Sequence, residues 1–167
     1  VDTDVEDVHD DRCSHGSGSA DGAVTRALAR AVTPHVMGVV NASLDSLTGG
    51  VDAARAKDLA SEMVASGASV LDCGGQSLRT DRREISVAEE LDALLPVIEA
   101  VVAACPGCAI SVDTYRAAVA AAALDAGATL INDPSGLVDP GMAELVAEGD
   151  VDLVVAYSRA TPKVRMS

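Results

Sequence analysis

The chain has 167 residues, enough for one domain, and 49% of them are hydrophobic, which is enough to build a core. Its formal charge of −14 comes from 26 acidic residues against 12 basic ones. Such a surface repels nucleic acid and anionic membranes, because it has no basic patch to displace counterions. We therefore expect neither kind of partner. A surface rich in Asp and poor in Lys is also typical of proteins that work at high salt.

The first 33 residues differ in composition from the rest. Acidic residues crowd the start, and residues 14–22 are rich in Gly and Ser. This composition buries too little apolar surface to remain ordered, so we predict a disordered acidic tail over 1–33 and a folded domain over 34–167. The start lacks the basic and apolar segments of a signal peptide, and no apolar run approaches the ~20 residues of a membrane span. These features predict a cytoplasmic protein.

From residue 34 onward short aliphatic runs alternate with amphipathic segments. The runs are typical of strands buried in a parallel sheet, and the segments have the spacing of helices. The predicted strands are residues 36–40, 69–73, 109–112, 129–132 and 153–156. The order βαβαβαβαβ, with strand starts some 20 to 40 residues apart, predicts an α/β fold with parallel strands.

Local signals mark several helix ends. Ser86 and Glu89 have the spacing of a capping box, and Asp139 with Pro140 suits the N-cap and first position of a helix. Gly67 stands where a C-cap glycine belongs. Pro96 falls inside a predicted helix and is expected to kink it.

Cys105 and Cys108 have the spacing of a metal knuckle or a redox pair, but no second pair supplies two further ligands. They also lie between a helix and a strand, rather than at a helix start that would favour a reactive thiolate. We interpret them as small buried thiols in a loop.

Two architectures fit this order of elements. One is an open doubly wound sheet of five strands, and the other is a (β/α)₈ barrel of which about five βα units are present. Ligands bind at the carboxyl ends of the strands in both. Polar residues stand at four successive strand ends, namely Asn41, Asp72, Asp113 and Asn132 with Asp133. Four in a row predict a lined pocket.

The open-sheet alternative requires motifs that the sequence lacks. A dinucleotide fold would place G-x-G-x-x-G after its first strand, and a phosphate loop would carry Gly-Lys-Ser/Thr. A receiver domain that used Asp113 would need an acidic pair after the first strand and a Lys after the fifth. The chain has Asn41 and Ala156 at those places.

Five motifs in order resemble those of dihydropteroate synthases. MGVVNASLDS at residues 37–46 is similar to their first-strand signature, and LDCGGQSLR at 71–79 resembles their second motif. ISVDT at 110–114, LIND at 130–133 and RATP at 159–162 are similar to the segments that follow. The resemblance covers about residues 35–166. It implies a partial (β/α)₈ TIM barrel, about five βα units of a pterin-binding barrel.

The resemblance implies a transferase of folate biosynthesis. The family condenses 6-hydroxymethyl-7,8-dihydropterin pyrophosphate with p-aminobenzoate, releases pyrophosphate and uses Mg²⁺. Asp113 and Asn132 match the positions that hold the pterin, and Asn41 matches the asparagine that faces the metal and the pyrophosphate. Arg79 and Ser77 match residues near the pyrophosphate. The resemblance thus implies catalytic roles for Asn41, Arg79 and Asp113, metal binding by Asn41, and substrate binding by Asp113, Asn132, Ser77, Arg79, Asp45 and Ser46 of the first loop.

The sequence also departs from the family pattern. The second motif has Gln76 in place of Glu and Leu78 in place of Thr, and the family's later strands, including a Ser-Arg-Lys motif, have no counterpart. Three interpretations follow. The first is a transferase of which this chain is an incomplete part, with a possible homodimer in a full-length form. The second is a pterin-binding relative without synthase activity, such as a methyltetrahydrofolate-dependent methyltransferase, and the third is a non-catalytic remnant or interaction module. A barrel cut after its fifth strand would expose the edges of its first and fifth strands.

Overall fold

The computed structural model describes residues 34–42, 50–77, 81 and 83–157, where strands and helices alternate. The predicted tail over 1–33 lies outside these residues. The elements in chain order are β1 (Met37–Asn41), α2 (Ala53–Ala65), β2 (Val70–Gly74), α3 (Val87–Ala104), β3 (Ala109–Asp113), α4 (Ala117–Asp125), β4 (Leu130–Asp133), α5 (Pro140–Glu148) and β5 (Asp152–Val155). The predicted strands are confirmed, with ends that differ by about one residue. Within the described residues, no helix has the length and apolar character needed to cross a bilayer.

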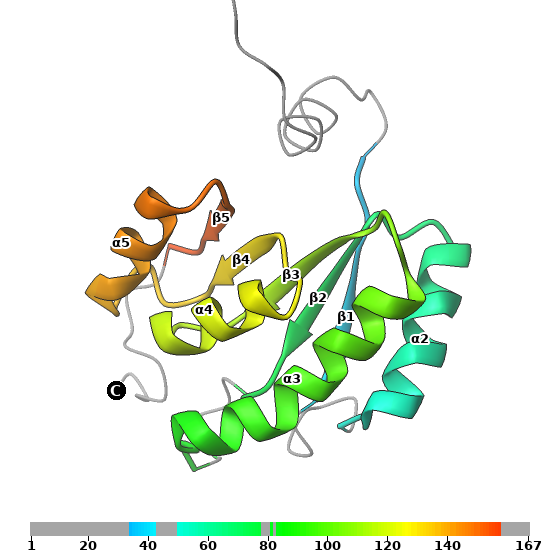
Figure 1. The fold of residues 1–167 in the computed structure, drawn as a ribbon, viewed down its shortest axis with the longest axis horizontal. Coiled ribbons are helices and arrows are strands. Elements are labelled where there is room, and N and C mark those ends of the chain that lie inside the picture. Colours follow the sequence, from blue (N-terminus) through cyan, green and yellow to red (C-terminus); the bar gives the residue numbers. More distant parts are fainter. Residues whose placement is uncertain (1–33, 43–49, 78–80, 82, 158–167) are drawn as a thin grey trace, which may run out of the picture.

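The strands form one parallel sheet in the sequential order β1-β2-β3-β4-β5. Crossovers between parallel strands are almost always right-handed, so a sequential order brings all the connecting helices to the same face. Figure 1 shows the helices together on one side of the strands. A doubly wound sheet would instead reverse its order partway and carry helices on both faces. The observed winding is that of a (β/α) barrel, and the open-sheet alternative is excluded.

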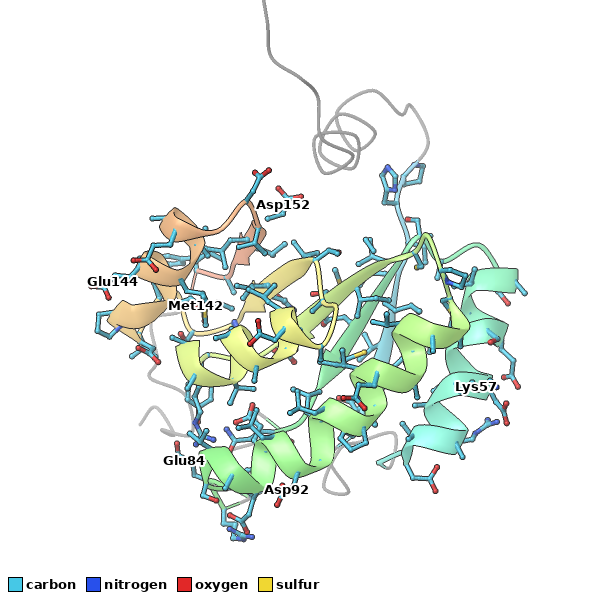
Figure 2. All side chains as sticks on the ribbon, viewed as in Figure 1. Lys57, Glu84, Asp92, Met142, Glu144 and Asp152 are labelled. Carbon is cyan, nitrogen blue, oxygen red and sulfur yellow. The ribbon has the colours of Figure 1, made fainter. Side chains whose placement is uncertain are left out.

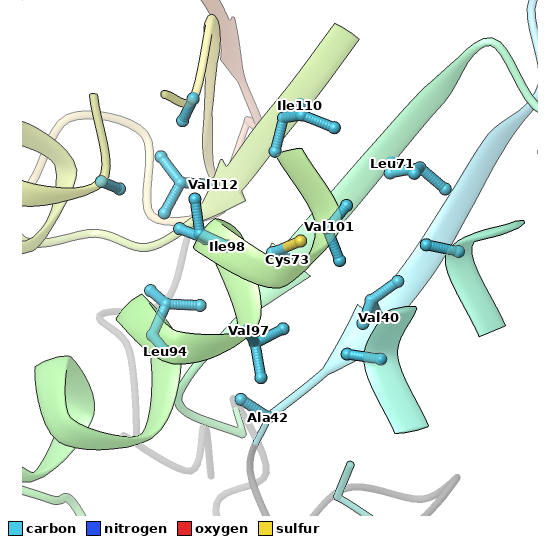
Figure 3. Close-up of a cluster of buried hydrophobic side chains, with 14 of the residues drawn as sticks. Val40, Ala42, Leu71, Cys73, Leu94, Val97, Ile98, Val101, Ile110 and Val112 are labelled. Carbon is cyan, nitrogen blue, oxygen red and sulfur yellow. The ribbon is translucent and has the colours of Figure 1, made fainter. Parts of the chain in front are cut away.

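The face of the sheet toward the helices is apolar. Val40, Leu71, Cys73 and Val112 alternate along the strands and are fully buried. Figure 3 shows them packed against one side of α3. The residues of α3 that take part are Leu94, Val97, Ile98 and Val101. Aliphatic side chains and a thiol thus fill the layer between the sheet and the helices, as expected for a chain without Phe or Trp.

The opposite face of the sheet has a different character. Val39 and Val154 lie on it and are 51% and 45% exposed, whereas Val40, one residue along β1, is fully buried. Near the carboxyl ends of the strands the same face carries polar side chains. In a (β/α) barrel this face lines the interior. The polar residues there are therefore the candidates for ligand binding.

The helix ends agree with the sequence. Ser86 caps α3 with Glu89 in a complete capping box, and Gly67 takes the left-handed conformation, with φ of 103°, just after α2. Helix α3 continues through Pro96 from Val87 to Ala104. Asp139 does more than predicted. One carboxylate oxygen accepts the N–H of Gly141 at 3.0 Å, and the other accepts that of Ala117 at 2.8 Å, so this residue caps α5 and α4 together.

A buried ion pair joins α3 to the loop after β3. Glu90 is 1% exposed, accepts from Arg116 at 2.6 Å and from the hydroxyl of Thr114 at 3.0 Å. The other end of the guanidinium donates to Glu84 at 2.8 Å and to the carbonyl oxygen of Ile85 at 2.7 Å. In Figure 2 Glu84 lies beside the start of α3, whereas Lys57, Asp92 and Glu144 point into solvent.

We expect Glu90→Ala to lower the free energy of unfolding by about 3 kcal/mol, because it leaves a mostly buried guanidinium without its nearest carboxylate. Chemical denaturation measures this change. Glu89→Gln is the matched control, since that neighbouring side chain is exposed and the amide still accepts the capping hydrogen bonds. We expect no measurable change for the control. Equal effects of the two substitutions would contradict a stabilising role of the buried pair.

The prediction of two buried thiols holds for Cys105 but only in part for Cys108. Cys105 is buried at the end of α3, and Cys108 is half-buried. Burial raises the pKa of the Cys108 thiol and raises that of Cys73 to about 12. No group of three metal-ligating side chains occurs in the described part of the chain. The thiols of Cys73 and Cys108 are thus protonated, and Cys105 packs in the core.

Candidate functional site

Three of the predicted site residues lie on one rung of the sheet. The strand register pairs Asn41 with Gly74, Gly74 with Asp113, and Asp113 with Asn132. These residues stand at or next to the carboxyl ends of β1, β2, β3 and β4, and paired residues point their side chains to the same face. That face is the one without helices. The register thus brings together an amide, a carboxylate and a second amide that are far apart in the sequence.

Gly74 keeps the middle of this rung open. A Cβ atom at this position would lie 3.4 Å from Oδ2 of Asp113 and 3.6 Å from Oδ1 of Asn41. Any side chain would therefore fill the space between those two oxygens. Gly75 serves a different purpose, because a Cβ there would come within 3.1 Å of the backbone oxygen of Glu90 on α3. The first glycine leaves room at the site, and the second allows close packing of the helix.

The Asp113 carboxyl group is held in an environment that disfavours its charge. Burial is the main cause, and the nearby carboxylates of Asp72, Glu90 and Asp133 add repulsion. Together they raise the pKa of Asp113 to about 7. The group therefore changes charge near neutral pH. A ligand that donates N–H groups to the ionised carboxylate would offset both effects.

Asn132 donates from Nδ2 to Oδ2 of Asp72 at 3.1 Å. Its neighbour Asp133 is fully buried and has a structural role, because its carboxylate accepts the backbone N–H groups of Ser135 at 2.7 Å and Leu137 at 2.8 Å. Those bonds form the turn that follows β4. Of the two polar residues at this strand end, only Asn132 is thus available to a ligand.

The loop after β2 is tied to the loop after β3. Gln76 is 8% exposed, donates from Nε2 to the hydroxyl of Tyr115 at 2.8 Å, and accepts the N–H of Ile85 at 2.9 Å. The Tyr115 hydroxyl in turn donates to Glu84 at 2.9 Å. Because that hydroxyl has already given its proton, its second partner must be a donor. An amide at position 76 satisfies this requirement, whereas a glutamate would not. Ser77 follows directly and is half-buried.

Comparison with known proteins shows the family of this chain. A sequence profile for the family described as "Pterin binding enzyme" matches residues 37–167. The chain belongs to the pterin-binding enzyme family. The probable bifunctional folylpolyglutamate synthase/dihydropteroate synthase of Haloferax volcanii is 42% identical over 130 residues, which are 76% of this chain and 15% of that protein. The Escherichia coli dihydropteroate synthase is 36% identical over 136 residues, which are 78% of this chain and 47% of that enzyme.

Solved structures agree with this assignment to the pterin-binding family. The Yersinia pestis dihydropteroate synthase in complex with a sulfonamide drug superposes with a TM-score of 0.70 and 37% identity, over 77% of this chain and 47% of that one. Burkholderia cenocepacia dihydropteroate synthase complexed with 7,8-dihydropteroate gives a TM-score of 0.65 at 35% identity, over 79% and 44%. The chain spans about half the length of the dihydropteroate synthases that it matches. The predicted resemblance and the partial barrel are confirmed.

Three predicted site residues lie outside the described part of the chain. Asp45 and Ser46 belong to the first loop and Arg79 to the second. Their roles stay predictions. Ser77 is described at the start of the second loop, two residues before Arg79. Any contact of these side chains with a phosphate group rests on the family resemblance.

The predicted Mg²⁺ can be compared with the oxygens that the site offers. Mg²⁺ in phosphate-transfer sites is held by one or two protein oxygens, by phosphate groups and by water, rather than by a full protein cage. Oδ1 of Asn41 lies within 4 Å of the open position beside Gly74. An amide oxygen is chemically suited to Mg²⁺, with phosphate and water oxygens as the other ligands.

A cavity of about 510 Å³ lies elsewhere in the molecule, between the end of α2 and the loop after α3. Its walls include Val64, Ala68, Pro106 and Cys108. It opens at the amino ends of the strands, opposite the polar rung. Barrel enzymes place their chemistry at the carboxyl ends. We therefore assign the candidate site to the rung of Asn41, Asp113 and Asn132.

Sequence reasoning missed the contribution of Asp72 to the site, and it also missed the buried pair that holds the loop after β3. Asp72 was noted as a polar strand end, but its contact with Asn132 joins positions 60 residues apart. Side chains alternate between the two faces of a strand, so the sequence does place Asp72 on the same face as position 74. Arg116 and its buried partner on α3 had no sequence signal beyond their charges, because 26 residues separate them.

Proposed function

We propose that this chain forms the amino-terminal part of a dihydropteroate synthase, which condenses 6-hydroxymethyl-7,8-dihydropterin pyrophosphate with p-aminobenzoate to give 7,8-dihydropteroate and pyrophosphate. The main support is the rung at the carboxyl ends of the strands, where Asp113 and Asn132 combine a carboxylate with an amide. A carboxylate accepts two N–H bonds side by side, and this is the pattern that an aminopyrimidine edge presents. The dihydropteroate synthases among the relatives support the choice of reaction.

In the proposed reaction the amino nitrogen of p-aminobenzoate attacks the methylene carbon attached to the pterin ring. A C–N bond forms, the C–O bond to pyrophosphate breaks, and the nitrogen loses a proton. Asp113 and Asn132 would hold the ring so that its methylene carbon points out of the sheet toward the loops. Correct positioning of this kind can account for a large part of a rate enhancement.

The leaving pyrophosphate would be held by the loops. Arg79 is suited to a phosphate because its planar guanidinium donates two parallel hydrogen bonds, and Ser77 lies in the same loop. Asp45 and Ser46 would help the first loop to cover the reacting groups. Mg²⁺, held by Asn41 and the phosphate oxygens, would neutralise the charge that develops on the leaving group. The cytoplasmic location and a homodimer of a full-length form belong to the same proposal.

Binding of a pterin to the 167-residue chain tests the proposal. The chain contains no Trp, so the fluorescence of 6-hydroxymethylpterin can be followed without an indole signal. We expect saturable binding and a clear preference for this 2-amino pteridine over lumazine, which has a carbonyl oxygen at the same ring position. A folded chain that binds neither compound at millimolar concentration would contradict the proposal. Equal binding of both would mean that the aminopyrimidine edge is not recognised.

A further inference from the structure

Asp72 is a buried carboxylate that has no cationic partner among the described residues. It lies in the middle of β2 and is 5% exposed, on the face of the sheet that carries the candidate site. In the described part of the chain, Arg55, Arg83 and Arg116 form ion pairs with glutamates and not with Asp72. A buried and unpaired carboxylate is costly to fold. Its presence calls for an explanation other than stability.

The carboxylate of Asp72 has one hydrogen-bond partner, the side chain of Asn132, among the described residues. Oδ2 accepts from Nδ2 of Asn132 at 3.1 Å, while Oδ1 is buried with no hydrogen-bond partner. Ser111, its register partner on β3, is fully buried and its hydroxyl also lacks a partner. The amide of Asn132 is therefore the one polar group within hydrogen-bond distance of this carboxylate in the described structure.

This contact decides which end of the Asn132 amide faces the ligand. An asparagine side chain can turn by 180° and exchange its donor and acceptor ends at little cost when nothing holds it. An ionised carboxylate accepts hydrogen bonds and donates none. Only the NH₂ end of the amide can therefore face Asp72. The carbonyl oxygen is directed away from Asp72 and is left as the acceptor.

We propose that Asp72 is a positioning residue, which fixes the Asn132 amide with its carbonyl oxygen toward the ligand and thereby selects rings that present an N–H donor at that point. The inference rests on the proposed pterin function, because it assumes that Asn132 faces the ring. Asp113 and Asn132, neighbours on one rung, then both present acceptors to the ligand. Ligands with a carbonyl oxygen at the recognised edge would be rejected, because two acceptors would oppose each other.

The closing experiment compares the parent chain with Asp72→Asn. An asparagine at position 72 can donate to Asn132, so the amide can turn and present its NH₂ end to the ligand. We expect the preference for 6-hydroxymethylpterin over lumazine to fall by about tenfold, the value of one hydrogen bond. Ser111→Ala is the matched control, since it alters a buried polar group on the same rung as Asp72 and should leave the preference unchanged.

A purely structural role predicts a different result. A general loss of order would weaken the binding of both ligands equally, and the ratio of the two affinities would stay as in the parent chain. An unchanged ratio in folded Asp72→Asn would therefore overturn the proposal. So would a fall of the ratio in Ser111→Ala as large as that in Asp72→Asn, because the effect would then not depend on the carboxylate.

A measurement without ligand separates this proposal from the proposed function. The side-chain NH₂ protons of Asn132, assigned by their loss in Asn132→Asp, should exchange with water more slowly in the parent chain than those of an exposed asparagine. Rapid exchange in the parent would overturn the positioning role, whether or not a pterin binds. Slow exchange in a chain that binds no pterin would uphold the contact and refute the pterin function. The parent suffices for this test if Asp72→Asn does not fold.

Discussion

Replacing Asp113 with asparagine should weaken the binding of 6-hydroxymethylpterin by about 10- to 150-fold at about pH 8, the equivalent of 1.5–3 kcal/mol for hydrogen bonds to a charged group. The ionised carboxylate accepts two N–H groups of the ring, whereas an asparagine amide accepts at one end and opposes a donor at the other. Fluorescence titration of the parent and the variant measures the difference.

The loss of pterin affinity in Asp113→Asn should depend on pH. The pKa of Asp113 is raised to about 7 by burial and by the neighbouring carboxylates, so the acceptor form becomes abundant only as the pH rises through neutrality. Pterin affinity of the parent should increase between about pH 6 and about pH 8, and that of Asp113→Asn should stay flat. At about pH 5, where the parent carboxyl is protonated, the two proteins should bind almost equally.

The same group has the opposite effect on stability without ligand. The folded chain holds the Asp113 proton up to about pH 7, while the unfolded chain releases it near pH 4. Between those values the folded state binds more protons, so the free energy of unfolding falls as the pH rises. Denaturation of Asp113→Asn should lack this fall. A parent whose stability and pterin affinity do not vary over this range would show that Asp113 titrates normally.

The fold could be predicted well because the strands and helices are marked locally. Aliphatic runs predicted every strand within about one residue, and Ser86 with Glu89 predicted the start of α3. The choice between a barrel and an open sheet could not be made from periodicity, which is the same in both. It depended on the order of the strands in the sheet, which periodicity does not encode. The motifs supplied the answer from the sequence, and the sequential order confirms it.

The candidate site was predictable only where it follows the strand ends. Asn41, Asp113 and Asn132 each end a strand or stand one residue from its end, and parallel pairing brings such positions to one rung. The contacts that orient them were not predictable. Asp72 reaches Asn132 across the intervening strand β3, and Asp139 caps a helix 22 residues before it. Such contacts depend on side-chain directions that spacing does not encode.

Synthase turnover should require more strands than the five described here. The described part of the chain contains five strands, and its dihydropteroate synthase relatives are about twice as long. Met37, Val39 and Val154 are 39%, 51% and 45% exposed on the face that would line a closed barrel. Residues 1–167 by themselves should therefore bind a pterin weakly and convert no detectable p-aminobenzoate to dihydropteroate.

Fusing the remaining half of a relative, such as the Escherichia coli dihydropteroate synthase, after Ser167 should produce measurable turnover. The added strands would cover the exposed valines and would pair with the free edges of β1 and β5, which otherwise favour association between chains. A radiolabelled p-aminobenzoate assay measures product. The same fusion carrying Asp113→Asn is the control. Because the asparagine binds the pterin ring more weakly, the rate of this variant should be at least about tenfold lower. Turnover by residues 1–167 alone that equals turnover by the fusion would show that five strands suffice. An inactive fusion that still binds the pterin would instead favour a pterin-binding relative without synthase activity.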